Sequence, residues 1–362
     1  SGFWIMAYTT IDKSTDYFNT VLYTGDMVDG DGTGHTQAIT GVGFQPDWIW
    51  HKCRSHAQQH IIVDSVRGVS SYNFLNSSGD GPEATTNTNG AISSIDSDGI
   101  TLENGNDSSS KANNAGASGR TYVFWNWLGG GSASSNSDGD ITSSVSVNTT
   151  AGFSVGTFTG TGSTSTVGTG LTGTQMVFLK NRDTTTTNWV VYHDIVDGSY
   201  DYMYLNNTND NANSSLSHTL GNTFKVGTNN DTNATGDDYV FYAFKSIKGY
   251  SKLSTYTGNG NADGAFIYTG FKPAFILIKG TSTTRNWNLI DHKRLGYNPD
   301  NDRQYPNLFI ADNTADAINI LSNGFKCIGT QTDTNSSGVE YIYYAIAENP
   351  FVSSGGVPAT AR

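Results

Sequence analysis

The stretch Tyr122-Val-Phe-Trp-Asn-Trp127 occurs three times in this chain in slightly different form. It returns as Tyr239-Val-Phe-Tyr-Ala-Phe244 and as Tyr341-Ile-Tyr-Tyr-Ala-Ile346. Each version has Tyr, then Val or Ile, two aromatic residues, a small residue or Asn, and a large apolar residue. A short run that is apolar at nearly every position and rich in aromatic residues is typical of a strand buried on both faces. Its recurrence predicts an internally repeated fold.

Other landmarks accompany this strand in a fixed order. The first landmark is an aromatic residue followed by Thr-Gly, and the second is a run that begins with Gly and ends with Lys. The third is an apolar segment that ends in Asp, and the fourth is a hairpin that contains Gly. The three sets begin at Tyr23, Phe158 and Tyr256, their Lys residues are Lys52, Lys180 and Lys279, and their Asp residues are Asp64, Asp194 and Asp291. We therefore predict one unit in residues 1–130, a linker in 131–149, a second unit in 150–248 and a third in 249–362.

The spacing of apolar runs and turn residues predicts an all-β protein. Runs such as Met176-Val-Phe-Leu179 and Phe275-Ile-Leu-Ile278 are bounded by Gly, Pro, Thr and Asn, and no long stretch has a helical period. We expect three tandem β-sandwich repeats of the jelly-roll or lectin-like kind. Because each unit of about 100 residues is long enough for its own core, separate domains and a merged stack both remain open.

The net charge, the lack of long apolar segments and the cysteine content limit the range of possible functions. The net charge is −12, so the surface repels phosphate backbones, and we expect no nucleic-acid partner. Nothing is long and apolar enough to predict a membrane span. The two cysteines, Cys53 and Cys327, lie in different units, which predicts two buried free thiols rather than a disulfide framework.

Two groups of residues suggest a metal or acid–base site. Asp26, Asp29 and Asp31 lie in a segment where Asp alternates with Gly, as in calcium loops, but Asp-Gly pairs are equally typical of hairpin turns and the distal Glu of a calcium loop is missing. No cofactor other than this candidate Ca²⁺ is expected. Four histidines cluster in the first unit, at spacings that fit no metal motif: His35, His51, His56 and His60. His60 stands where the other units have Trp189 and Trp287, which predicts a packing role.

Two patterns resemble catalytic motifs without completing them. His193-Asp194 and Asp291-His292 are chain neighbours, and neighbours in a strand point to opposite faces, so neither pair is expected to form a hydrogen-bonded dyad. Glutamates are scarce and most aspartates lie in turns, so no carboxylate pair for glycosidic cleavage stands out. We expect no enzymatic activity.

The recurrent Lys and Asp residues have a structural interpretation. One strand ends in Lys and the next ends in Asp, so in an antiparallel pair the two charges would lie near one another at an end of the sheet. Such a pair contributes about 0–1 kcal/mol when exposed.

Tyrosines are the best candidates for glycan binding or for a protein interface. Loop and strand tyrosines can stack on sugar rings or fill an interface. Tyr200-Asp-Tyr-Met-Tyr204 alternates, which places its three tyrosines on one face of a strand, where a half-buried sheet face is the simpler explanation. The candidates are Tyr72, Tyr200, Tyr202, Tyr204, Tyr297 and Tyr305.

Several segments resemble a known family. They are Met6–Thr20, Ile39–Lys52, Asp64–Gly68, Ser254–Gly264 and Val357–Arg362. Across nearly the whole chain the sequence resembles a family of tailed-bacteriophage proteins, largely from marine phages, that are virion- or tail-associated and contain a domain of unknown function. The resemblance implies the phage particle as the setting and brings no catalytic residues.

Three functions follow as expectations. The first is a phage virion structural protein, a tail-fibre, head-fibre or capsid-decoration component that acts by assembly and adhesion on the particle surface. Its partners would be other virion proteins and further copies of itself, with a trimer as the first guess. The second is a carbohydrate-binding adhesin that recognises a host surface glycan, and the third is a polysaccharide depolymerase.

Overall fold

The computed structural model describes residues 9–28, 34–106, 116–294, 298 and 301–350. The regular secondary structure of these residues is almost entirely β-strand, as predicted. The helical segments described are a 3-10 turn, η1 (Ser14–Asp16), and one short helix, α1 (Thr332–Asn335). No helix among these residues is long and apolar enough to cross a membrane. The strands form six sheets, which fall into a first part (residues 9–130), a second part (131–248) and a third part (249–350).

The first part has a four-stranded sheet and a three-stranded sheet. Their strand orders are β1-β7-β3-β4 and β2-β6-β5. The strands are β1 (Phe18–Thr24), β2 (Thr36–Thr40), β3 (Trp48–Cys53), β4 (His60–Asp64), β5 (Ala91–Asp96), β6 (Gly99–Glu103) and β7 (Thr121–Trp127).

The second part has an eight-stranded sheet and a two-stranded sheet. Their orders are β15-β14-β13-β12-β17-β10-β9-β8 and β11-β16. The strands are β8 (Ser134–Asn136), β9 (Ser143–Asn148), β10 (Phe153–Thr159), β11 (Ser165–Gly168), β12 (Met176–Asn181), β13 (Val190–His193), β14 (Asp201–Tyr204), β15 (Ala212–Asn213), β16 (Thr223–Val226) and β17 (Asp238–Phe244). The expected linker at 131–149 is therefore wrong, because β9 pairs with β10 and extends the sheet. Its Ser- and Asn-rich sequence concealed the strands.

The third part has a five-stranded sheet and a three-stranded sheet. Their orders are β18-β25-β20-β21-β22 and β19-β24-β23. The strands are β18 (Ser251–Thr257), β19 (Asp263–Tyr268), β20 (Pro273–Gly280), β21 (Asn288–Asp291), β22 (Arg303–Gln304), β23 (Ile318–Leu321), β24 (Gly324–Ile328) and β25 (Glu340–Ala347).

The aromatic strand lies inside the large sheet in each part. β7 lies between β1 and β3, β17 between β10 and β12, and β25 between β18 and β20. The glycine that opens the run leading into β3, β12 or β20 has a positive φ, 91° at Gly43, 73° at Gly170 and 88° at Gly270. Glycine adopts this left-handed conformation without the steric cost that a side chain brings, which explains its recurrence.

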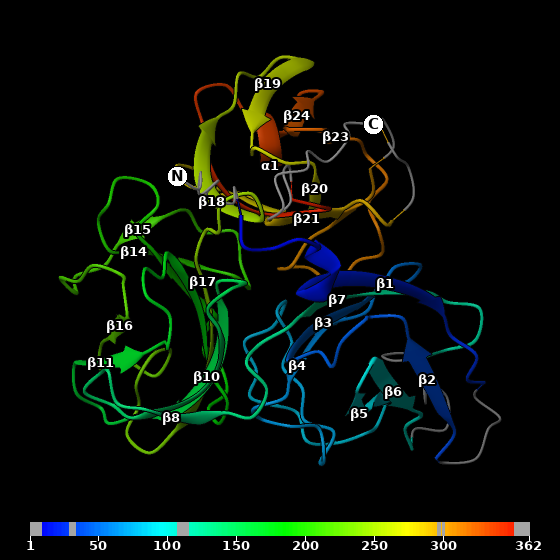
Figure 1. The fold of residues 1–362 in the computed structure, drawn as a ribbon, viewed down its shortest axis with the longest axis vertical. Helices are drawn as coiled ribbons and strands as arrows, with labels where there is room; N and C mark the ends of the chain where they lie inside the picture. Colours follow the sequence, from blue (N-terminus) through cyan, green and yellow to red (C-terminus); the bar gives the residue numbers. More distant parts are fainter. Residues whose placement is uncertain (1–8, 29–33, 107–115, 295–297, 299–300, 351–362) are drawn as a thin grey trace, which may run out of the picture.

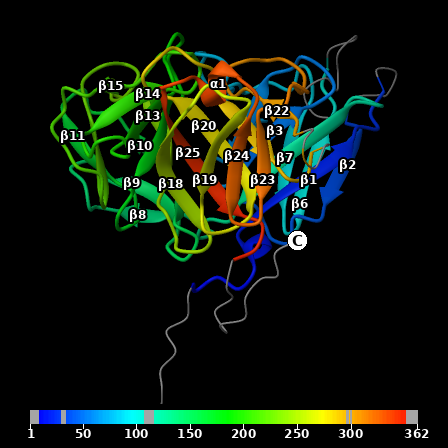
Figure 2. The same ribbon diagram turned by 90° about the horizontal axis from the view of Figure 1, so that it is seen from above.

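Both faces of each aromatic strand are buried, for two different reasons. Phe124, Phe241 and Tyr343 face the small sheet of their own part. Trp125, Tyr242 and Tyr344 point the other way, into one apolar cluster shared by all three parts, which we call the central core. Figure 1 shows the three large sheets around this centre with the small sheets outside, and Figure 2 shows the third part in front of the other two. Large members of the central core are Trp48, Trp50, Trp125, Trp127, Phe153, Phe178, Tyr242, Phe244, Phe275, Trp287 and Tyr344.

Aromatic pairs join every two parts within the central core. The ring centroids of Trp48 and Tyr242 are 4.6 Å apart, those of Trp127 and Phe275 are 5.3 Å apart, and those of Phe244 and Tyr344 are 5.1 Å apart. Such pairs each contribute about 0.5–1.5 kcal/mol beyond the area they bury. The three parts therefore form one packed body around a shared core.

Equivalent hydrogen bonds also link each part to the next. A backbone amide in a loop donates to the carbonyl of the residue just after β3, β12 or β20 of the neighbouring part, and a ring N–H donates to a backbone carbonyl of the neighbouring part. The first set is Glu83 to Arg182, Asn211 to Thr281, and Asp312 to Arg54, at 2.7–2.8 Å. The second set is Trp189 to Asn76, Trp287 to Tyr204, and His60 to Tyr305, at 2.8–3.0 Å. The links run from the first part to the second, the second to the third, and the third back to the first, so the ring is closed.

The expected Lys–Asp pairs do not form. In the antiparallel pair of β3 and β4, Lys52 lies opposite His60 and Asp64 lies opposite Trp48, so the two charges are at opposite ends. Two successive antiparallel strands end at opposite edges, and the sequence interpretation overlooked this. Each ammonium group instead donates to backbone carbonyls, as Lys180 does to Thr187 at 2.8 Å and Lys279 to Thr208 at 3.2 Å. We refer to Lys52, Lys180 and Lys279 as the three buried lysines.

Candidate functional site

The second part contains a pocket and has a narrower small sheet than the other two parts. The small sheets of the first and third parts have a third strand, β5 or β23, next to β6 or β24. In the second part, which is fully described, no third strand continues the sheet beyond β16. The pocket, of about 510 Å³, lies between β13–β14 of the large sheet and the segments 213–216 and 227–232. This volume is within the range of about 300–1,000 Å³ that is usual for small-molecule sites.

Three tyrosines form the wall of this pocket on the large sheet. Tyr202 and Tyr204 are half-buried on one face of β14, with ring centroids 5.6 Å apart and planes at 70°, and Tyr192 lies deeper on β13. Their shared face confirms the expected alternation. Burial raises the pKa of Tyr204 to about 12, and it also raises the pKa of Tyr192. The phenols of Tyr192 and Tyr204 therefore keep their protons near neutral pH and can donate hydrogen bonds.

The remaining wall is polar and contains no basic side chain. Its polar members are Thr164, Asn213, Ser214, Ser215, Thr228, Asn229, Asp231 and Thr232, and Leu216 adds an apolar contact. Asp231 is fixed by the backbone amide of Asn188 at 2.7 Å, and Thr232 donates to the side chain of Asn229 at 2.8 Å. The loop that carries these groups is therefore held in place before any ligand arrives.

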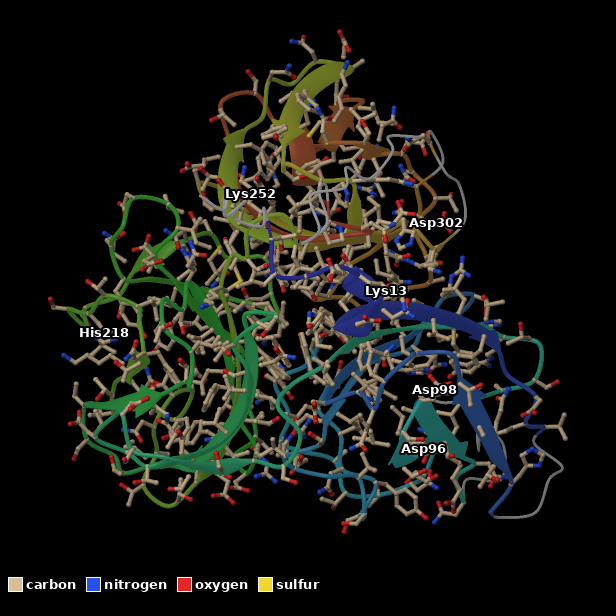
Figure 3. The ribbon with its side chains drawn as sticks, viewed as in Figure 1. Lys13, Asp96, Asp98, His218, Lys252 and Asp302 are labelled. Carbon is tan, nitrogen blue, oxygen red and sulfur yellow. The ribbon has the colours of Figure 1, made fainter. Side chains whose placement is uncertain are left out.

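Tyr200 is beside the pocket but has a structural role. Its side chain is 4% exposed, and its ring stacks on Tyr192. Its hydroxyl donates to the carbonyl of Lys225 at 2.8 Å and accepts from the amide of Lys225 at 3.1 Å. His218, labelled at the outer side of the second part in Figure 3, donates to the carbonyl of Thr223. These side chains form hydrogen bonds with the backbone groups at the edge of β16, where a third strand of the small sheet would otherwise pair.

The other candidate tyrosines lie elsewhere. Tyr72 is in the first part, and its hydroxyl donates to Glu103 at 3.0 Å. Tyr305 is 5% exposed in the third part, where its ring is covered by the Arg303 guanidinium at 5.3 Å. Tyr297 lies outside the described residues. The structure thus brings Tyr202 and Tyr204 together and separates Tyr72 and Tyr305 from them.

The metal and acid–base candidates do not assemble into a site within the described residues. Asp26 is exposed and lies 3.7 Å from His35, while Asp29 and Asp31 lie outside the described residues. In the described ranges, no group of three or more His, Cys, Asp or Glu side chains is placed to hold a metal ion. The two cysteines are free and buried, as predicted.

The buried histidines serve packing and hydrogen bonding. His60 accepts from the indole of Trp50 at 2.9 Å and makes the link to Tyr305, so it fills the place of the two tryptophans as predicted. Burial lowers the pKa of His51 to about 3 and that of His193 to about 4, so both are neutral near pH 7. His193 contacts Asn211 at 2.9 Å and not its chain neighbour Asp194, which agrees with the absence of a dyad expected there.

Sequence reasoning missed two buried ionic networks between the parts. Asp64 pairs with Arg67, and Arg67 contacts Glu83, which accepts from Arg182 of the second part at 2.7 Å. In the third part Asp291 pairs with Arg294 at 2.6 Å, and Arg294 contacts Asp312 at 2.9 Å. Asp312 accepts from Arg54 of the first part at 2.8 Å. The sequence pattern that could have revealed these networks is Asp-x-x-Arg, which occurs as Asp64–Arg67 and Asp291–Arg294. The second part has Asp197 in place of the arginine.

Fold and pocket together define an all-β protein with packed sheets and one tyrosine-lined polar pocket in its second part. A family described as a domain of unknown function (DUF7483) matches residues 13–350, and the chain belongs to that family. No curated protein and no solved structure matches the chain.

Proposed function

We propose that this protein is a non-enzymatic structural component of a phage particle, exposed on its surface as part of a tail fibre, a head fibre or a capsid decoration. The observation that carries the proposal is the closed ring, in which each part is joined to both others by equivalent hydrogen bonds. A body of this kind is stiff and resists local opening, as a particle surface requires. The resemblance of five segments to phage structural proteins supplies the setting.

We also infer that the three parts are tandem copies of one β-sandwich repeat of jelly-roll or lectin-like kind. Two observations support this. The four central strands of the large sheet run in the same order in each part, with the aromatic strand second in the series β1-β7-β3-β4, β10-β17-β12-β13 and β18-β25-β20-β21. The hydrogen bonds between parts also fall on matching positions. Duplication of one module explains both observations.

The proposal that the protein is not an enzyme rests on how its ionisable groups are used. Buried carboxylates and histidines of the described residues take part in structural bonds, as Asp291 does with Arg294 and His60 with Trp50. Catalytic groups instead need to face a substrate in a cleft with a matched pKa.

Association with other virion proteins and with further copies of the chain remains part of the proposal. The large sheets already cover one another within one chain, so contacts between chains would use outer surfaces. The edge strand β19 exposes Phe266 and Tyr268, at 49% and 56% of their surface, and we expect a neighbouring virion protein or copy to cover them.

Purified particles provide the test. Mass spectrometry should find the chain in particles at a fixed stoichiometry, and an antibody label should place it on their surface in electron micrographs. Light scattering on the isolated protein would report its oligomeric state. A chain that is abundant in the lysate and absent from purified particles would refute the proposal.

A carbohydrate-binding adhesin is the alternative, favoured by the tyrosine-lined pocket between β14 and the loop 227–232. The two functions are compatible, because a surface component of a particle can also attach to a host glycan. A glycan array probed with the intact protein would separate pure assembly from adhesion.

A further inference from the structure

We propose that the pocket of the second part binds an uncharged saccharide, with Tyr202 and Tyr204 as the stacking residues. This inference deepens the adhesin alternative given above and rests on it. The pocket lies in the part whose small sheet has two strands instead of three, and Tyr202 and Tyr204 line it with side chains that are only half-buried.

The chemistry of the lining fits a sugar ring. A pyranose has an apolar face of C–H groups and a rim of hydroxyls, and it is recognised by an aromatic ring on one side and planar polar groups around it. Tyr202 and Tyr204 stand at 70° to one another, so one ring can lie under the sugar and the other can contact its edge. Asn213, Asn229 and Asp231 supply amide and carboxylate groups at the opposite wall.

The charge of the lining selects against acidic sugars. Lys, Arg and His are absent from the lining, all of which lies in fully described chain, whereas Asp231 contributes a carboxylate. A sialic acid or uronic acid would place its carboxylate near Asp231, and no cation in the lining could pair with it, on a chain whose net charge is −12. An uncharged hexose or N-acetylhexosamine meets no such penalty.

A peptide strand is disfavoured as the occupant. Strand addition needs free amides and carbonyls on the edge of a sheet. At the open edge of β16, the Tyr200 hydroxyl already bonds the amide and the carbonyl of Lys225, and His218 bonds the carbonyl of Thr223. A small ligand that fits beside these side chains keeps those bonds intact.

Saturation-transfer NMR and a glycan array with the full chain test the proposal. The probes are uncharged saccharides (glucose, galactose and N-acetylglucosamine, with their short oligomers) and, as acidic counterparts, glucuronic acid and N-acetylneuraminic acid. We expect binding of at least one uncharged probe and none of the acidic sugars. Tyr204→Ala should weaken binding by about tenfold or more, because it removes both the stacking ring and its hydroxyl.

Two further variants make the outcome decisive. Thr228→Trp places a bulky group at an exposed position of the pocket wall, where folding is not at stake, and should abolish binding. Phe309→Ala removes an exposed aromatic side chain of the third part and should leave binding unchanged. The inference is overturned if no uncharged probe binds the folded protein, if an acidic sugar binds as tightly as the uncharged probes or more tightly, or if Thr228→Trp binds like the unaltered chain. Incorporation into particles is measured separately, so a failure here leaves the virion proposal standing.

Discussion

Replacing Arg294 with Met would show how much one ionic network contributes to the closed ring. The Arg294 side chain is fully buried and contacts Asp291, Asp312 and the carbonyl of Leu289, and its guanidinium lies 5.3 Å from the Trp125 ring of the first part. Met keeps most of the volume and removes the charge. The Asp291 carboxylate is then buried without its cation, a situation that costs about 3–5 kcal/mol. Loss of the cation–π contact adds about 0.5–2 kcal/mol.

The pH dependence distinguishes this mechanism from simple loss of packing. Burial alone would raise the pKa of Asp291, but the Arg294 guanidinium and nearby hydrogen bonds hold it below its usual value. In the unaltered chain the pair therefore stabilises the fold above the unfolded pKa of about 3.9, and this stability is lost as pH falls through the folded pKa. In Arg294→Met the pKa of Asp291 should rise, so protonation relieves the buried charge and the difference between variant and unaltered chain shrinks from pH 7 to pH 5.

Urea denaturation at both pH values measures the effect. Lys293→Met, at the exposed neighbouring position, is the matched control and should change stability by no more than about 0.5 kcal/mol. Asp291→Asn combined with Arg294→Met should recover part of the loss. A loss below about 1 kcal/mol at pH 7, or one that is the same at pH 5, would refute the reasoning.

Three further predictions concern other buried groups. Burial lowers the pKa of each of the three buried lysines to about 8, so between pH 8 and 10 each lysine binds more protons in the unfolded chain than in the fold and adds on the order of 1–2 kcal/mol of stability as pH rises. Buried tyrosines such as Tyr256, whose pKa is raised, act in the opposite direction, so the effect is measured as a difference. In thermal melts the unaltered chain should gain this amount over Lys279→Met from pH 8 to 10, and a constant difference between the two would count against the prediction. Because the pKa values of His51 and His193 lie below 6.5 in the fold, stability should fall as pH drops from 6.5 to 4.5, and the double Gln variant should flatten this decline in the same melts. His60→Phe leaves the Trp50 indole and the Tyr305 carbonyl without hydrogen-bond partners, and it should lower the free energy of unfolding by about 2–4 kcal/mol in urea denaturation. Trp189→Phe removes a single hydrogen bond, to the carbonyl of Asn76, so after correction for side-chain volume it should lower the free energy of unfolding by less. Equal corrected effects of the two variants would contradict the role given to His60.

The sequence predicted the class of fold and the position of its central strands well. The aromatic strand, the Gly-led strand and the strand ending in Asp are β7, β3 and β4 in the first part, and their counterparts have the same places in the other two. These features are local, because residue types and their spacing fix which segments are strands and which faces are apolar. The alternation along Tyr200–Tyr204 likewise predicted correctly that two pocket tyrosines share one face of a strand.

Only the tertiary structure determined which segments cover the apolar faces of each strand. A strand that is apolar on both faces must be packed against other segments on each face. Its sequence does not say whether those segments belong to the same part, to another part of the chain or to another chain. Here the central core supplies that cover. Contacts such as that of the Arg294 guanidinium with the Trp125 ring, and the hydrogen bond from Lys279 to the carbonyl of Thr208, form only where separate parts meet. The pocket likewise depends on tertiary structure, since its walls come from β13, β14 and the segments 213–216 and 227–232. Local pattern sets which face of a segment avoids water, and only the packing of distant segments determines what excludes the water from it.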